Sequence, residues 1–227
     1  MALDNDELQA KALRVHRLLL AYYGEPAWKE QRDPLSELVL TILSQNTADV
    51  NTSRAYASLR QRFPTWGDVA QADTQEVAEA IKIGGLAQIK APRIQRILRQ
   101  VHQETGQFAL DFLADRSVPE AKAYLTALEG VGPKTAACVL LFSLHRPALP
   151  VDTHVHRVAR RVGLVPPKAS AEKTHERLEE LLPPETYYPF HLNVIRHGRT
   201  LCKAASPRCA ECPLIDECDY GRAAQAS

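Results

Sequence analysis

The segment LEGVGPKTAACV, residues 128–139, combines a glycine-rich turn with a single cation at the start of an otherwise small and apolar helix. Gly130 and Gly132 tolerate backbone angles that a side chain would forbid, so EGVG predicts a tight turn. We expect helices on both sides of this turn, near 118–128 and 133–144. The segment therefore predicts a helical hairpin.

Lys134 is the cation of that segment. Pro133 suits the first helical position, because its missing N–H costs nothing there and its fixed φ is already helical. Lys134 then lies in the first helical turn, where free amides and the macrodipole favour an anion and disfavour an ammonium group. A phosphate suits this turn well. The alternative is a solvated surface lysine after a hairpin, and the segment by itself leaves both interpretations open.

Four of the five cysteines lie in one short segment, CKAASPRCAECPLIDEC. Cys202, Cys209, Cys212 and Cys218 have the spacing C-x6-C-x2-C-x5-C, which predicts a metal site in a reducing compartment rather than a disulfide framework. Structural zinc commonly uses two C-x2-C pairs, whereas one pair flanked by two single cysteines favours an iron–sulfur cubane; zinc remains the alternative. Cys138 lies in the apolar stretch AACVLLF and is expected to be a buried core thiol.

Apolar residues recur at helical spacing along almost the whole sequence, and strand-like alternation is scarce, so the fold is predicted to be all-α. The segments DPLSE and SVPEA mark helix starts at Asp33 and Ser117. Proline and glycine breaks between the apolar stretches indicate roughly nine or ten short helices. The proline-rich segment 145–150 is the best candidate for a domain boundary.

The formal net charge is only +1, but the charges are segregated along the sequence. Three segments carry basic residues without acids, namely 81–103, 153–171 and 195–210. Each is typical of a solvated helix face, yet three of them beside the motifs above favour a nucleic-acid partner. The first residues are acidic where a secretion signal is basic, and no apolar run approaches bilayer length. We therefore expect a soluble, intracellular protein.

The sequence resembles the endonuclease III family of helix-hairpin-helix DNA glycosylases. The resemblance rests on LEGVGPKTA, ALPVDTHVHRV and HGRTLCKAASPRCAECPLIDEC, with weaker likenesses in LTILSQNTADV and IKIGGLAQIKA, and it spans most of 33–220. It implies a two-lobed α-helical fold with damaged or abasic double-stranded DNA in the cleft between the lobes. The resemblance also leads us to expect a cytoplasmic monomer that works on nucleoid DNA. A six-helix barrel lobe is expected at 28–147, and a lobe with a four-iron four-sulfur (4Fe-4S) cluster on the four cysteines is expected at 1–27 and 148–227.

The resemblance assigns catalytic roles to Lys134 and Asp152. A lysine at the position of Lys134 is the nucleophile of the family, which attacks C1′ of a flipped-out nucleoside and leaves a Schiff base that proceeds to strand scission by β-elimination. Asp152 matches the catalytic aspartate, whose carboxylate can stabilise positive charge at C1′ and transfer protons. In its own sequence context, Asp152 or Thr153 is also a good N-cap for the helix that follows, and the two roles are compatible.

The resemblance also implies side-chain contacts with the DNA. Asn46 and Leu86 would fill the gap that a flipped base leaves in the stack. Asn46 departs from the glutamine of the best-known family pattern, and its shorter amide would reach the opposite base less well. Leu86 follows two glycines, and the alternative for it is a core leucine near a turn. His154 either touches the DNA near the lesion or merely covers the helix start.

Oxidised, ring-saturated pyrimidines are the substrates that the resemblance favours, although no motif specifies the groups that read the base. Two other functions are open. A monofunctional glycosylase for mismatched bases would share the fold and the cluster, but such relatives typically carry serine or tyrosine at the position of Lys134. A non-catalytic module would hold DNA phosphates through the amides of Gly130, Val131 and Gly132, and the joint presence of Lys134 and Asp152 disfavours it.

Overall fold

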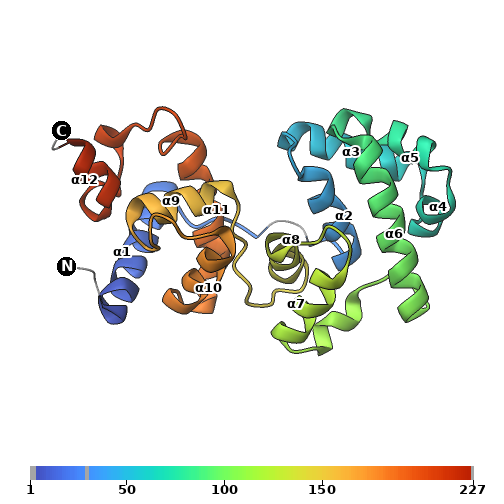
Figure 1. Ribbon diagram of the computed structural model, residues 1–227, viewed down its shortest axis with the longest axis horizontal. Coiled ribbons are helices and arrows are strands. Elements are labelled where there is room, and N and C mark those ends of the chain that lie inside the picture. Colours follow the sequence, from blue (N-terminus) through green and yellow to red (C-terminus); the bar gives the residue numbers. More distant parts are fainter. Residues whose placement is uncertain (1–3, 29–30, 226–227) are drawn as a thin grey trace. The chain divides into compact units, whose positions relative to one another are not determined.

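The structure of the protein, a computed structural model, describes residues 4–28 and 31–225 (Figure 1). Within these ranges the regular elements are all helices and no strand occurs, which confirms the all-α prediction. None of the helices in these ranges combines the length and the apolar character of a bilayer-spanning segment. The α-helices are α1 (Asn5–Tyr23), α2 (Pro34–Ser44), α3 (Asp49–Arg62), α4 (Trp66–Gln71), α5 (Thr74–Ala80), α6 (Ala87–Thr105), α7 (Val118–Ala127), α8 (Pro133–Cys138), α9 (Thr153–Val162), α10 (Ala171–Leu181), α11 (Tyr187–Thr200) and α12 (Asp219–Gln225). Short 3-10 or π segments lie between them, namely η1 (Lys82–Gly84), η2 (Asp111–Asp115), η3 (Val139–Ser143), η4 (Pro184–Thr186), η5 (Cys209–Glu211) and η6 (Ile215–Glu217).

The number of helices differs from the prediction. The described residues form twelve α-helices, whereas the sequence indicated nine or ten. The difference arises from short helices such as α4, α5 and α12, which have only six or seven residues. A helix of fewer than two turns shows too few apolar repeats for its period to be recognised, so the sequence pattern underestimates the number.

Contacts within the chain divide it into two compact units. The middle unit is Glu30–Arg146, and the terminal unit combines Met1–Lys29 with Pro147–Ser227. The chain passes from the middle unit to the terminal unit within 145–150, the proline-rich segment. The terminal unit is therefore built from two separate stretches of the sequence, and the middle unit from one.

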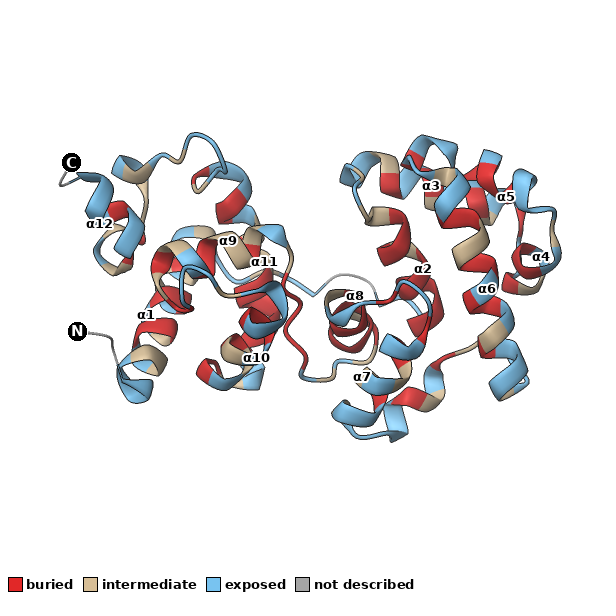
Figure 2. Ribbon diagram, viewed as in Figure 1, coloured by how far each residue is buried: buried red, intermediate tan, exposed pale blue. Residues whose placement is uncertain are grey.

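Helix α2 lies at the centre of the middle unit. Its N-cap is Asp33, whose Oδ1 accepts a hydrogen bond from Ser36 N over 2.8 Å, and Pro34 is its first residue, as the sequence predicted. Nine of its eleven residues are buried (Figure 2). Helices α3, α6 and α8 pack around it, so the apolar stretch LVLTIL is the core of this unit.

Helix α6 is the longest helix of the middle unit, and α4 and α5 both pack against it. Its buried Gln95 donates through Nε2 to the carbonyls of Val69 and Ala72 over 2.9 and 2.8 Å. The side-chain oxygen of Gln95 accepts a hydrogen bond from Thr74 Oγ1 over 2.6 Å. One buried amide side chain therefore connects α6 to the last turn of α4, to its C-cap Ala72 and to the start of α5.

The predicted hairpin is formed by α7 and α8. Ser117 is the N-cap of α7, which confirms the predicted helix start, and it forms a capping box with Glu120. Helix α8 starts at Pro133, but it continues as the π segment η3 rather than as one α-helix to 144. Cys138, the predicted core thiol, is only 3 % exposed. The apolar end of the hairpin is thus buried in the middle unit.

The terminal unit joins helices from both of its stretches. Helix α1 packs against α10 and α11, and α9 packs against α10, α11 and α12. The buried ammonium of Lys11 on α1 donates to Asp219 Oδ1 at the start of α12 over 3.0 Å. Gly163, at the end of α9, leaves room for this ion pair, because a Cβ there would lie 1.9 Å from Asp219 Oδ2. Three helices therefore meet at one ion pair.

Removal of the Asp219 carboxylate tests this connection. In Asp219→Ala the buried ammonium of Lys11 loses its partner, so the free energy of unfolding of the terminal unit is expected to fall by about 1–3 kcal/mol. Asp216→Ala is the matched control, because Asp216 is exposed and makes no hydrogen bond or ion pair with the described residues. Chemical denaturation of both variants measures the difference, and equal midpoints would contradict the role assigned to the pair.

Candidate active site and cysteine pocket

The turn of the hairpin depends on Gly130. Its φ is +74°, in the left-handed region that residues with a side chain rarely adopt. A Cβ at this position would also lie 2.4 Å from Nε of Arg93, which reaches the turn from α6. Arg93 Nη1 donates in turn to Gln45 Oε1 over 3.2 Å, and Arg96 holds Glu129 through two hydrogen bonds of 2.5 and 2.7 Å. Helix α6 therefore supports the hairpin turn from two sides.

Unbonded backbone amides gather at the turn and at the start of α8. The N–H groups of Gly130, Gly132 and 134–135 have no acceptor in the described residues. Val131 is an exception, and the prediction of a free amide there was wrong. Its N–H donates to Leu128 O over 3.1 Å, and its side chain is buried. The remaining amides form an arrangement that attracts an anion.

Lys134 lies in the first turn of α8, as the sequence predicted. Its side chain is half-buried, and its amine makes no hydrogen bond or ion pair with the described residues. The first turn of α8 contains no acidic residue, and the N-cap position is Gly132, which has no side chain to offer. The amine is thus free of protein partners in this part of the chain and adjacent to amides that favour an anion.

Asp152 is the N-cap of α9. Its Oδ1 accepts a hydrogen bond from Val155 N over 2.8 Å, which confirms the capping role and selects Asp152 over Thr153. The other carboxylate oxygen has no hydrogen-bond partner in the described residues. Asp152 belongs to the terminal unit, whereas Lys134 belongs to the middle unit. The capping bond therefore leaves one oxygen of this carboxylate available to a ligand.

His154 covers the contact between α9 and α11. Arg157 Nη2 donates to its Nδ1 over 3.1 Å, so in the neutral ring the proton is on Nε2. Gly198 on α11 makes room for this side chain, because a Cβ there would lie 2.9 Å from both Cβ and Nδ1 of His154. His154 therefore covers the contact of α9 with α11, and its Nε2 proton has no acceptor in the described residues.

Asn46 and Leu86 lie on two loops of the middle unit. Both are exposed, and the 50 % exposure of Leu86 excludes the alternative of a core leucine. Both also have positive φ, 54° and 52°, and among the described residues other than glycine only His145 shares this feature. Strained backbone of this kind persists where the surrounding structure holds it, often at ligand-binding sites.

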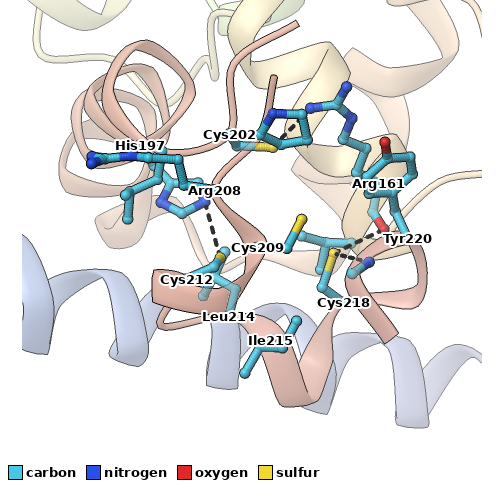
Figure 3. Close-up of a pocket in the computed structure, with 14 residues that line it drawn as sticks. Arg161, His197, Cys202, Arg208, Cys209, Cys212, Leu214, Ile215, Cys218 and Tyr220 are labelled. Atoms are coloured by element: carbon cyan, nitrogen blue, oxygen red, sulfur yellow. Dashed lines mark hydrogen bonds between the residues drawn. The ribbon is translucent and has the colours of Figure 1, made fainter. Parts of the chain in front are cut away.

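The four cysteines of the C-terminal segment line one pocket of the terminal unit (Figure 3). They lie between the end of α11 and the start of α12, and Leu214 and Ile215 add apolar walls. Burial raises the pKa of the Cys212 thiol to about 11 and also raises that of Cys218. Burial thus opposes thiolate formation here, and a bound metal group is what would stabilise thiolates in this pocket.

Polar groups reach three of the four cysteine sulfurs. The contacts are from Arg161 Nη1 to Cys202 Sγ at 3.4 Å, from Gly221 N to Cys218 Sγ at 3.3 Å and from His197 Nε2 to Cys212 Sγ at 3.6 Å. Hydrogen-bond donors to ligand sulfurs orient the ligands and tune the metal group that they hold.

His197 connects this pocket to α1. It is only 1 % exposed, and burial lowers its pKa to about 4, so the ring is neutral at physiological pH. The hydroxyl of Tyr23 lies 3.1 Å from Nδ1 of His197. When Cys212 is a thiolate ligand, the Nε2 of His197 must carry the ring proton, and Tyr23 then donates to Nδ1. No spacing rule in the sequence indicated this histidine.

The four cysteine sulfurs do not converge on one point in the part of the chain that the structure describes. In a tetrahedral zinc site the sulfurs lie about 3.8 Å apart, because each Zn–S bond is about 2.3 Å long. Among the residues that the structure describes, no three His, Cys, Asp or Glu side chains converge closely enough to hold one metal ion. The four thiols line one pocket, and a 4Fe-4S cluster held by them is the prediction that metal analysis tests.

Two arginines of α9 hold the cysteine segment. Arg157 donates to the carbonyls of Gly198 and Cys202, and Arg161 donates to those of residues 203–204. In the sequence both arginines counted among the cations that favour a nucleic-acid partner. The structure gives both arginines a second role inside the protein, which the charge pattern could not indicate because their acceptors lie more than 40 residues away.

The sequence and the structure of this chain are similar to those of known DNA repair proteins. Residues 39–184 match the HhH-GPD superfamily of base excision DNA repair proteins. The chain is 36 % identical to endonuclease III of Thermotoga maritima, over 87 % of this chain and 88 % of the relative. It is 40 % identical to a putative DNA glycosylase of Arabidopsis thaliana, over 82 % of this chain and 67 % of that protein. A solved non-covalent endonuclease III–DNA complex matches with a TM-score of 0.81 at 27 % identity, over 96 % of this chain and 99 % of the other.

The cysteine pocket predicts the metal content of the protein. Anaerobically prepared protein is expected to be brown and to contain about four iron and four sulfide ions per chain. Cys212→Ser should lower the iron content and the thermal stability of the terminal unit, while Cys138→Ser should leave the iron content unchanged, because Cys138 lies in the middle unit. Iron, zinc and acid-labile sulfide are measured together, and stoichiometric zinc without sulfide would rule out the cluster.

Proposed function

Because this chain belongs to the HhH-GPD superfamily of base excision DNA repair proteins and is homologous to endonuclease III, we propose that it removes oxidised pyrimidines from double-stranded DNA and then cleaves the strand. The family and the DNA glycosylase class, which the motifs predicted, are confirmed by these similarities. The substrate and the chemical steps go further and are proposals. The observation that carries them is Lys134, an amine without a partner in the described residues at the start of α8.

In the proposed reaction the neutral amine of Lys134 attacks C1′ of a nucleoside that has turned out of the stack. The new N–C1′ bond replaces the glycosidic bond, and the base leaves with a proton. The sugar ring opens to an iminium, which makes the neighbouring C2′–H acidic. Loss of that proton expels the 3′-phosphate and cuts the strand by β-elimination. A hydroxyl nucleophile cannot form the iminium, so a lysine at this position favours a glycosylase that is also a lyase.

Asp152 has the complementary role in this proposal. Positive charge develops at C1′ as the base departs, and a nearby carboxylate stabilises it. The same group can take and return the protons that move during attack and elimination. One of its oxygens caps α9 through Val155 N, which orients the carboxylate, and the other has no partner in the described residues.

The hairpin would bind the DNA backbone. In this proposal the free amides of Gly130 and Gly132 donate to DNA phosphates. Phosphate contacts position the duplex without reading its sequence. Val131 leaves this set, because its N–H is bonded to Leu128 O. His154 remains a candidate contact through its Nε2 proton, in addition to covering α11.

Asn46 and Leu86 would fill the gap in the stack from which the base has turned out. Both are exposed, and Leu86 is an apolar side chain in solvent at the start of α6, which a stacking role explains. The four cysteines would hold a 4Fe-4S cluster, and binding would fix the segment between α11 and α12 and offset the thiolate charge. In this proposal the cysteine segment is structural, and the reacting groups are Lys134 and Asp152.

Loss of the Lys134 amine should abolish the covalent step. Borohydride is expected to trap a protein–DNA adduct on a duplex with one thymine glycol and on a duplex with one abasic site. Lys134→Gln should form no adduct and keep its DNA affinity within about threefold, because the amide cannot form an iminium. Lys122→Gln on α7 removes an equal charge outside the site and should form the adduct normally. An adduct that persists in Lys134→Gln would show that another amine is the nucleophile, and a wild-type protein that binds without reacting would be a DNA-binding module.

The variant Asp152→Asn distinguishes the catalytic role of the carboxylate charge from the role of Asp152 as the N-cap of α9. Asparagine is as good an N-cap as aspartate, so the stability of α9 should be kept. Base release is expected to fall by about two to four orders of magnitude, because charge stabilisation and proton transfer are lost. Trapping at a preformed abasic site should survive in part, since Lys134 is still present. Single-turnover rates on both duplexes measure this, and base release close to the wild-type rate would remove Asp152 from the mechanism.

A further inference from the structure

Lys90 on α6 is a buried lysine without a carboxylate partner in the described residues. It is only 2 % exposed, and burial lowers its pKa. The three hydrogens of its ammonium group match three acceptors. These are the carbonyl of Leu43 at 2.7 Å, the hydroxyl of Thr47 at 2.8 Å and the carbonyl of Gly84 at 2.9 Å. A methionine would fill the same space without desolvation of a charge, so the lysine requires another explanation.

Two of the three acceptors of Lys90 belong to two loops, and the third, the carbonyl of Leu43, lies in the last turn of α2. The Asn46 loop, residues 45–48, connects α2 with α3, and the Leu86 loop, residues 84–86, leads from η1 into α6. Thr47 lies in the first loop and Gly84 in the second, 37 residues further along the chain. The hydroxyl of Thr47 also donates to the carbonyl of Gly84. One ammonium group and one hydroxyl therefore join the two loops to each other.

Each of these loops contains one residue with a strained backbone and an exposed side chain. Asn46 and Leu86 have positive φ, and neither is a glycine, so an isolated loop would relax toward other conformations. The carbonyl of Leu86 accepts hydrogen bonds from the backbone amides of Ile89 and Lys90, over 3.0 and 2.9 Å. Lys90 thus holds the Leu86 loop through both its backbone and its side chain.

We propose that Lys90 is a positioning residue that holds Asn46 and Leu86 as one rigid pair, ready to enter the gap left by a flipped base. The inference rests on the proposed function, in which these two side chains fill that gap. Loops that moved independently would have to be ordered when DNA binds, and that ordering costs free energy of binding. Lys90 itself is buried and uses all three ammonium hydrogens inside the protein, so it acts through the loops and not on the substrate.

Three variants separate positioning from general stability. Lys90→Met removes the ammonium group at similar side-chain length. Thr47→Val keeps Lys90 and its two carbonyl acceptors but removes the hydroxyl that links the loops. This variant tests the proposal by itself if Lys90→Met does not fold. Gln95→Met is the matched control, because Gln95 is also buried on α6 and also makes three side-chain hydrogen bonds, none of them to these loops.

The readout is the ratio of two single-turnover rates, base release from an intact thymine glycol duplex and cleavage of a duplex with a preformed abasic site. Lys90→Met and Thr47→Val should lower the first rate by about tenfold or more and the second by less than about threefold, because an abasic site has less stacking to break. Leu86→Ala should show the same selectivity. In the double variant Lys90→Met with Leu86→Ala, the two effects should be less than multiplicative, since Lys90 acts through Leu86.

Each result either supports or overturns the proposal. Selective loss on the intact duplex in Lys90→Met or Thr47→Val, with equal changes on both duplexes in Gln95→Met, supports it. Equal slowing of both reactions in the Lys90 and Thr47 variants, or full multiplicativity with Leu86→Ala, would reduce Lys90 to a structural residue. If the wild-type protein processes neither duplex, the proposed function fails instead, and borohydride trapping identifies that case independently of Lys90.

Discussion

The register of α6 is the constraint on which the middle unit depends, because this helix carries polar side chains that must find partners away from water. Lys90 bonds to the two loops near the start of the helix, Arg93 lies against Gly130 of the hairpin turn, and Gln95 bonds to the end of α4. A buried polar group without a partner costs free energy, so a shift of α6 by one residue would break all of these contacts together. The positions of the hairpin turn and of the two loops are consequently both set by the position of α6.

The N-termini of α8 and α9 are both positive ends of helix dipoles, but they carry side chains of opposite charge. Asp152 places a carboxylate at the positive end of α9, where it also accepts a hydrogen bond from Val155 N. Lys134 places an amine at the positive end of α8, beside backbone amides that have no acceptor in the described residues. The first helix start is complete within the protein. In the proposed function a DNA phosphate completes the second.

Much of the fold could be predicted from the sequence where the signal is local. The N-cap at Asp33, the glycine turn of the hairpin and the grouping of the cysteines all act within a few residues, and Lys134 was recognisable because its own neighbours define its position. The partners of the basic residues could not be predicted. Lys90 bonds to a carbonyl 47 residues away and Arg157 to one 45 residues away, so internal cations looked like a surface charge pattern. Long-range contacts, not composition, decide which cations remain for a ligand.

The ion pair of Lys11 with Asp219 joins positions 208 residues apart. A ribosome that adds about 5–20 residues per second leaves α1 waiting roughly 10–40 s for this partner. During that interval the apolar side chains of α1, Val15 and Leu19 among them, lack the rest of the terminal unit, whereas the middle unit is fully synthesised before the second stretch of the terminal unit begins. An apolar helix face that stays exposed for this time favours aggregation of the nascent chain, which is the hazard that chaperones counter. The pocket of four cysteines is completed in the same late stage of biogenesis that captures α1.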